Sequence, residues 1–135
     1  MPGPAVWMIR LSLCYLLFAV VIGAAILVHK AVPFHPAVWG LLPVHYEIAI
    51  WGWLVQFVMG TAYWIFPRYL KSQGRGPVGL AWAVLIGLNT GIWLLAGSVF
   101  IESIAIAGRI LILLSVAAYV GLMWNRVVSY RNHEK

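Results

Sequence analysis

Three histidines, His29, His35 and His45, are the residues in the N-terminal part of the chain best suited to chemistry. They lie in or beside strongly apolar stretches, where a polar ring must hydrogen-bond within the protein or coordinate something. Neutral imidazole is a common ligand of haem iron, and also of copper and zinc. His45 is the first candidate, because it opens the apolar stretch 43–68.

The residues that follow His45 on the same face of an ideal helix are mostly small. At about 100° per residue, Gly52 and Gln56 lie roughly 20° from His45, and Gly60 lies roughly 60° from it. A flat macrocycle needs such a groove, so this face predicts contacts to a cofactor. Glu47 lies roughly 160° from His45, which excludes a local His/Glu metal pair on one helical face.

Composition determines the kind of element that carries these residues. The chain has 135 residues, of which 64% are hydrophobic and 9% are charged, so an ordinary soluble domain is excluded. Four apolar runs, at about 6–28, 43–66, 77–100 and 103–124, are each near the length that crosses a bilayer of roughly 30 Å. We therefore expect an all-α integral membrane protein, a four-transmembrane-helix bundle that forms one domain over residues 1–135.

Basic residues predict the orientation of this bundle. They gather in the second connection (Arg68, Lys71, Arg75) and after the fourth run (Arg126, Arg131, Lys135). By the positive-inside rule, both termini are expected in the cytoplasm and the three histidines near the outer side. The net charge of +6 thus indicates topology, and no nucleic-acid partner is expected.

The order of His45, Gly60, an aromatic-rich turn and the pair Pro67-Arg68 resembles the second helix of catalytic subunit I of haem-copper oxidases. The likeness is strongest to the cbb type and its nitric-oxide-reductase relatives, and the chain is similar to small stand-alone relatives of their first four helices. The resemblance implies that His45 is an axial ligand of a low-spin haem b. The helices that carry the copper ligands and the high-spin haem ligand have no counterpart here. No copper and no complete oxygen or nitric oxide reduction is therefore expected.

A low-spin haem usually takes two axial ligands. His29, at the outer end of the first run, and His35, in the first connection, are candidates for the second ligand. Another subunit or a five-coordinate iron are the alternatives. His45 itself has an alternative as an interfacial histidine solvated by water and head groups. The three histidines could also bind copper or zinc, although no Cys or Asp ligand lies near them in the sequence.

Arg109 lies inside the fourth apolar run and needs an anionic or polar partner there. Glu102 is one candidate, since it lies roughly 10 Å away along the helix on nearly the same face. A haem propionate is the other, because the guanidinium fork suits a carboxylate. Glu47 is either a solvated interfacial carboxylate or the start of a proton path.

These observations favour a small b-type cytochrome, or a haem-bearing subunit of a respiratory complex, in a prokaryotic cytoplasmic membrane. Either cytochrome c or a quinol would serve as its redox partner, and a homo-oligomer or a larger assembly is expected. The alternative is a haem-free accessory or assembly subunit that packs against a larger oxidase or binds quinone or lipid. No catalytic nucleophile and base are recognisable, so an electron-transfer component is expected instead of a complete enzyme.

Overall fold

The computed structural model describes residues 1–66 and 76–128, and helices are the only regular secondary structure in the described part. The elements in chain order are α1 (Gly3–Ala31), the 3-10 helix η1 (Pro36–Leu41), α2 (Leu42–Glu47), the π-helix η2 (Ile48–Val55), α3 (Gln56–Ile65), α4 (Val78–Gly97), the 3-10 helix η3 (Glu102–Ile104) and α5 (Ala105–Val128). Four helical stretches are long and apolar enough to cross a membrane: Gly3–Ala31, Pro36–Ile65, Val78–Gly97 and Glu102–Trp124. The predicted all-helical fold with four apolar helices is thus confirmed.

The second of these stretches differs from a plain α-helix. Between α2 and α3, the eight residues of η2 wind as a π-helix. A π-helix has a wider turn than an α-helix, and π segments are frequent at functional sites. The turn angle of 100° per residue therefore does not hold across Ile48–Val55, although the chain runs through it without a break.

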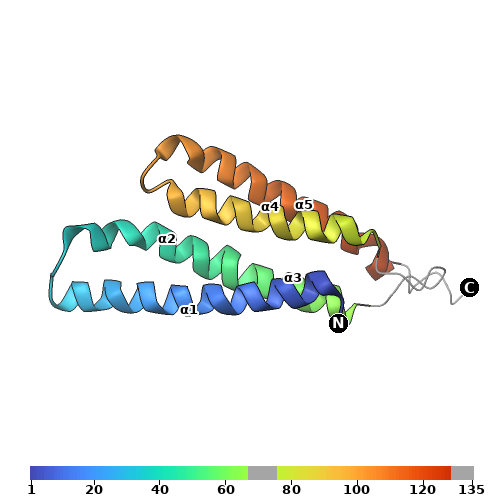
Figure 1. The fold of residues 1–135 in the computed structure, drawn as a ribbon, viewed down its shortest axis with the longest axis horizontal. Coiled ribbons are helices and arrows are strands. Elements are labelled where there is room, and N and C mark those ends of the chain that lie inside the picture. Colours follow the sequence, from blue (N-terminus) through green and yellow to red (C-terminus); the bar gives the residue numbers. More distant parts are fainter. Residues whose placement is uncertain (67–75, 129–135) are drawn as a thin grey trace, which may run out of the picture.

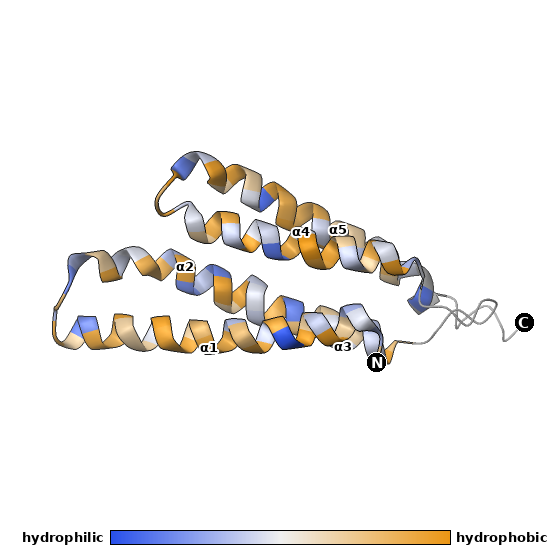
Figure 2. Ribbon diagram, in the orientation of Figure 1, coloured by the Kyte–Doolittle hydropathy of each residue, from blue (hydrophilic) through white to orange (hydrophobic). Residues whose placement is uncertain are grey.

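The helices form two hairpins, one made of α1 with α2–η2–α3 and the other of α4 with α5 (Figure 1). The start of α1 and the end of α5 lie at the same end of the bundle, which we call the terminal end. The two hairpins pack together mainly through α4, which contacts α1, α2 and η2 of the first hairpin. Hydrophobic residues run along all four long stretches (Figure 2). The predicted basic cluster of the second connection and most of the basic tail lie outside the described residues.

Small residues of α4 allow α5 to approach closely. A Cβ atom added at Gly91 would lie 2.7 Å from Ile112 Cγ1, and one added at Gly87 would lie 2.5 Å from Ser115 Oγ. Both distances are below normal contact, so a larger side chain would push the helices apart. These two glycines of the third apolar run therefore lie at a packing face inside the bundle.

Polar contacts join the two hairpins near the terminal end. The Tyr119 hydroxyl donates to the Met59 carbonyl oxygen at 2.7 Å. The Arg126 guanidinium donates to the carbonyl oxygens of Tyr63, at 3.2 Å, and of Phe66, and it lies over the Tyr63 ring. Arg126 is only 2% exposed. It was expected as a marker of the cytoplasmic side, and the structure gives it the additional role of linking α5 to α3.

Candidate functional site

His45 lies in α2 with its ring against α1. Its Nδ1 atom is 3.0 Å from the carbonyl oxygen of Ala19. A Cβ atom added at Gly23 would lie 2.9 Å from the ring carbon Cε1 of His45, so the imidazole occupies space that any other residue type would fill. The absence of a side chain at Gly23 thus positions the ring on the α1 backbone.

This hydrogen bond determines the tautomer of neutral His45. A carbonyl oxygen can only accept, so the proton must lie on Nδ1, and Nε2 keeps its lone pair. Histidines that bind metals commonly donate the other ring N–H to a carbonyl or carboxylate, which fixes the orientation of the ring. The neutral form of His45 therefore has the tautomer that an axial ligand requires.

His29 has the opposite tautomer. It is 5% exposed, and its Nδ1 accepts from the backbone N–H of Phe34 at 3.2 Å and of His35 at 3.5 Å. The neutral ring must then carry its proton on Nε2, which leaves it no free lone pair for a metal. The rings of Phe34 and Trp39 lie edge-on to it, at centroid distances of 5.1 Å and 5.9 Å. His29 thus holds the connection after α1 in place, and this geometry does not suit the role of second ligand.

His35 has a similar local role. Its side chain is exposed, and its Nδ1 accepts from the backbone N–H of Ala37 at 3.2 Å, at the start of η1. The lone pair on Nδ1 is therefore used within the chain, as it is in His29. Among the residues that the structure describes, no group of three or more His, Cys, Asp or Glu side chains could hold a metal ion.

The small-residue face below His45 is not an open groove, because α1 occupies it. A Cβ atom at Gly52 would lie 2.6 Å from Tyr15 Cγ, and one at Gly60 would lie 2.9 Å from the Cβ atom of Met8. The side-chain amide of Gln56 donates to the Met8 carbonyl oxygen at 3.3 Å. Gly52, Gln56 and Gly60 do lie on one face, as expected, but this face packs against the neighbouring helix α1. Gly52, Gln56 and Gly60 are therefore helix-packing positions here, which corrects the expectation of a groove for a macrocycle.

An open groove does lie beside His45, on the outward side of α1 and α2. Its volume is about 490 Å³. It is lined by Ala19, Val20, Gly23, Ala24, Ile26, Leu27, Leu42, His45 and Tyr46. Apart from His45 and Tyr46 the lining is aliphatic or glycine, as expected of a surface that contacts lipid or an apolar ligand.

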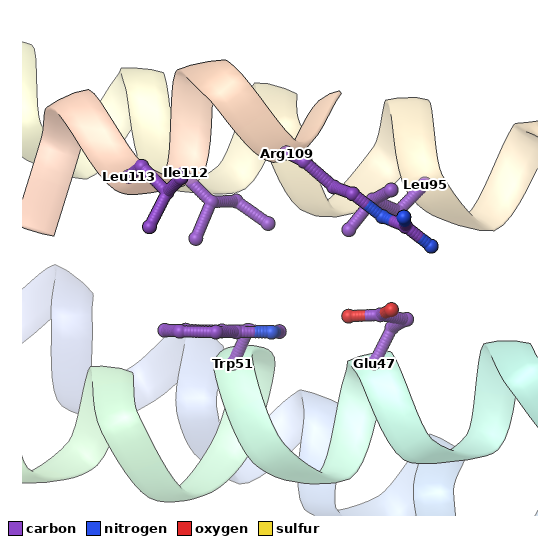
Figure 3. Close-up of a pocket in the computed structure, with 6 residues that line it drawn as sticks. All are labelled: Glu47, Trp51, Leu95, Arg109, Ile112 and Leu113. Atoms are coloured by element: carbon purple, nitrogen blue, oxygen red, sulfur yellow. The ribbon is translucent and has the colours of Figure 1, made fainter. Parts of the chain in front are cut away.

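Arg109 faces a different part of the molecule. It lines a cavity of about 270 Å³ together with Glu47, Trp51, Leu95, Ile112 and Leu113. In Figure 3 the guanidinium of Arg109, on α5, points towards the carboxylate of Glu47, on α2. The acidic group opposite Arg109 is therefore Glu47, where the sequence suggested Glu102. His45 faces α1, on the other side of α2, so this arrangement does not favour contact between Arg109 and a propionate of a haem on His45.

Sequence reasoning missed three residues that shape these sites. Gly23 and Ala19 place and orient His45 from α1, and Trp51 forms, next to Glu47, one wall of the cavity that faces α5. The signal for Trp51 was present, because residues four apart lie on the same face of a helix. For Ala19 the contact is made by a backbone carbonyl, which side-chain identity does not reveal.

Comparison with known proteins adds no family to this picture. No family model, no curated protein and no solved structure matches the chain.

Proposed function

We propose that this protein is a small membrane cytochrome b in which His45 supplies an axial nitrogen to a haem iron. The observation that carries the proposal is the hydrogen bond from Nδ1 of His45 to the Ala19 carbonyl, which leaves Nε2 as the only ring nitrogen able to bind a metal. The resemblance of this helix to that of haem-copper oxidases points to the same residue. A bound haem would supply one-electron transfer.

The packing of the helices restricts where a haem on His45 could lie. The face of Gly52 and Gly60 is filled by α1, so the macrocycle cannot lie there. The open groove between α1 and α2 remains, with His45 on one side and the small residues Gly23 and Ala24 on the other. These residues would hold the group, and the apolar lining would keep water from it.

The chain's own residues then have three tasks. Ala19 fixes the tautomer and the orientation of His45 through its carbonyl oxygen. Gly23 leaves room for the imidazole next to the α1 backbone. Leu27 and Tyr46 also line the groove, and would offer apolar and aromatic surface to the group.

The second axial position is open in this account. Both His29 and His35 use the Nδ1 lone pair for backbone N–H groups. A second ligand would then come from another protomer or from a partner subunit, and a five-coordinate iron is the alternative. This arrangement supports a homo-oligomer or a place in a respiratory complex over a solitary bis-histidine cytochrome.

We place the protein as a multi-pass protein in the cytoplasmic membrane of a prokaryote, with both termini in the cytoplasm. The structure supports this orientation in that the start of α1 and the end of α5 lie at one end of the bundle. In the sequence, the basic residues gather between the end of α3 and the start of α4 and after the fourth apolar run, and these helix ends lie at that same end of the bundle. His45 and the groove beside it then lie nearer the outer side.

A second candidate function is a haem-free accessory subunit that packs against a larger oxidase. The observation that favours it is the close fit of α1 onto Gly52 and Gly60, which leaves the predicted cofactor face filled by protein. In this reading the groove beside His45 receives a helix of the partner or a lipid chain.

Visible spectra of two histidine variants test the first proposal. His45→Ala should insert normally but lose the low-spin spectrum of haem b, because His45 is the only histidine of the described residues whose Nε2 keeps its lone pair. His29→Ala is the matched control, and it should keep the spectrum, since the His29 lone pair is already engaged. A pigmented His45→Ala protein would contradict the proposal, and a wild-type protein without pigment would favour the accessory subunit.

A further inference from the structure

The cavity between α2–η2 and α5 holds two opposite charges that do not pair with each other. Glu47 is half-buried and Arg109 is exposed, and their side chains point towards one another across the cavity (Figure 3). No ion pair joins the two side chains in the structure. Both residues lie in helical stretches long and apolar enough to cross a membrane.

This separation of charges has a consequence for the chemistry of the cavity. Ionisable groups at membrane depth are costly unless a polar partner compensates them. A molecule that completes both must offer a hydrogen-bond donor to the Glu47 carboxylate and an acceptor to the Arg109 guanidinium. The exposure of Arg109 means that such a molecule can enter from the bilayer.

The walls of the cavity define the shape of the molecule. The indole ring of Trp51 presents its flat face to the side of the cavity formed by Ile112 and Leu113 (Figure 3). Ile112 and Leu95 are almost fully buried, at 2% and 5% exposure, so this wall is fixed by packing. An aromatic face opposite aliphatic side chains forms a slot that suits a flat ring. The volume of about 270 Å³ is enough for a single-ring head group but not for a macrocycle.

We propose that this cavity binds the head group of a membrane hydroquinone. One hydroxyl of the reduced ring donates to Glu47, the other oxygen accepts from Arg109, and the ring lies between Trp51 and the aliphatic wall. The site prefers the reduced ring to the oxidised ring, because a quinone has only acceptor oxygens and one of them would face the carboxylate. The proposal does not depend on a haem at His45.

The zwitterionic head group of phosphatidylethanolamine would also offer an ammonium to Glu47 and a phosphate to Arg109. It has no flat ring for the slot at Trp51, so the shape of the cavity favours the hydroquinone. The two ligands differ in a further respect, since only the hydroquinone changes its donors with redox state.

Binding of one compound in two redox states tests the proposal. The probes are a decyl-substituted benzohydroquinone, kept reduced under argon, and the corresponding benzoquinone, each titrated into the full-length protein in detergent. The wild-type protein should bind the reduced ring at least about tenfold more tightly. Glu47→Gln should remove this preference, because an amide both donates and accepts, and Arg109→Gln should weaken binding of both forms.

A matched pair of tryptophan variants tests the slot. Trp51→Leu should weaken binding about tenfold, whereas Trp93→Leu should not, because Trp93 lines a separate groove between α1 and α4. His45→Ala should bind the hydroquinone as the wild type does, so loss of haem and loss of this site are separate results.

Two results would overturn the proposal. Equal affinity for the oxidised and the reduced ring in both the wild type and Glu47→Gln would show that Glu47 does not contact the ring oxygen. Co-purified phosphatidylethanolamine that both Glu47→Gln and Arg109→Gln release, with no binding of either ring, would assign the cavity to a zwitterionic lipid.

Discussion

The polar contacts between the two hairpins differ at the two ends of the bundle. Near the terminal end, α5 is bonded to α3 by Tyr119 and Arg126, which donate to backbone carbonyls. At the other end, α5 is separated from α2 by the cavity of Glu47 and Arg109, and no ion pair closes it. Both ends carry an arginine of α5, but one arginine is used for packing and the other faces open space. A polar residue inside an apolar helix is therefore expected to stabilise the bundle only where a partner lies within hydrogen-bond reach.

Loss of the Arg126 contacts at the terminal end should lower the free energy of unfolding more than any other change proposed below. Arg126→Met keeps an unbranched side chain but loses the hydrogen bonds to the carbonyls of Tyr63 and Phe66 and the contact with the Tyr63 ring. We expect the free energy of unfolding to fall by about 2–3 kcal/mol, as for a lost buried bond to a charged group. Unfolding in mixed detergent micelles measures it. A variant as stable as the wild type would show that packing alone holds α5 to α3.

A substitution that disturbs the packing of α1 against η2 should lower the free energy of unfolding by nearly as much. Gly52→Ala places a methyl group 2.6 Å from the Tyr15 ring and should lower the free energy of unfolding by about 1–3 kcal/mol, the usual range for overpacking. Gly121→Ala, where nothing lies within 4 Å of the added methyl group, is the control and should cost nothing. Equal stability of the two variants would mean that Tyr15 does not lie against Gly52.

Gly52 and Gly60 also show how far the sequence determines the structure. The lengths of the apolar runs predicted the four helices, because the thickness of a bilayer fixes the length of a span. The small residues at Gly52 and Gly60 were correctly read as one face, yet a face without side chains fits a macrocycle and a neighbouring helix equally well. Only the positions of Tyr15 and Met8 on α1 decide between them.

His45 could be selected as a candidate residue from the sequence, but its surroundings could not be predicted. His45 could be selected from residue type and depth, but its tautomer depends on the backbone carbonyl of Ala19. His29 appeared equivalent in the sequence, and it differs because the following turn directs two backbone N–H groups at its Nδ1. Glu47 and Arg109 lie at one cavity only because helices far apart in the chain pack together, which the sequence did not indicate. The π-helix η2 had no recognisable sequence pattern either.

Removal of a single hydroxyl group at the terminal end should lower the free energy of unfolding less. Tyr119→Phe keeps the ring and removes only the hydroxyl that donates to Met59. The loss should be about 1 kcal/mol, the typical net value of one hydrogen bond. Tyr46→Phe is the control, because the Tyr46 side chain is 54% exposed, and its free energy of unfolding should not change. Equal losses in the two variants would exclude a specific role for the Tyr119 bond.

A change at the cavity of Glu47 and Arg109 should have the smallest effect on the free energy of unfolding. Glu47→Gln removes a charge that makes no ion pair with Arg109, so the free energy of unfolding should not fall by more than about 0.5 kcal/mol in the absence of ligand. The same micelle assay measures it, with Arg126→Met as the reference for a large effect. A loss as large as that of Arg126→Met would mean that Glu47 and Arg109 close into an ion pair, and the two ends would then be alike.

The most direct test of the central claim, that His45 binds a haem iron, is a reduced-minus-oxidised visible spectrum of the wild-type protein. The protein should be expressed with ample haem and with its natural partners, and the pigment identified by extraction into pyridine. The account predicts the spectrum of a low-spin haem b, which disappears in His45→Ala and persists in His29→Ala. A wild-type protein that carries no pigment under these conditions would contradict the account.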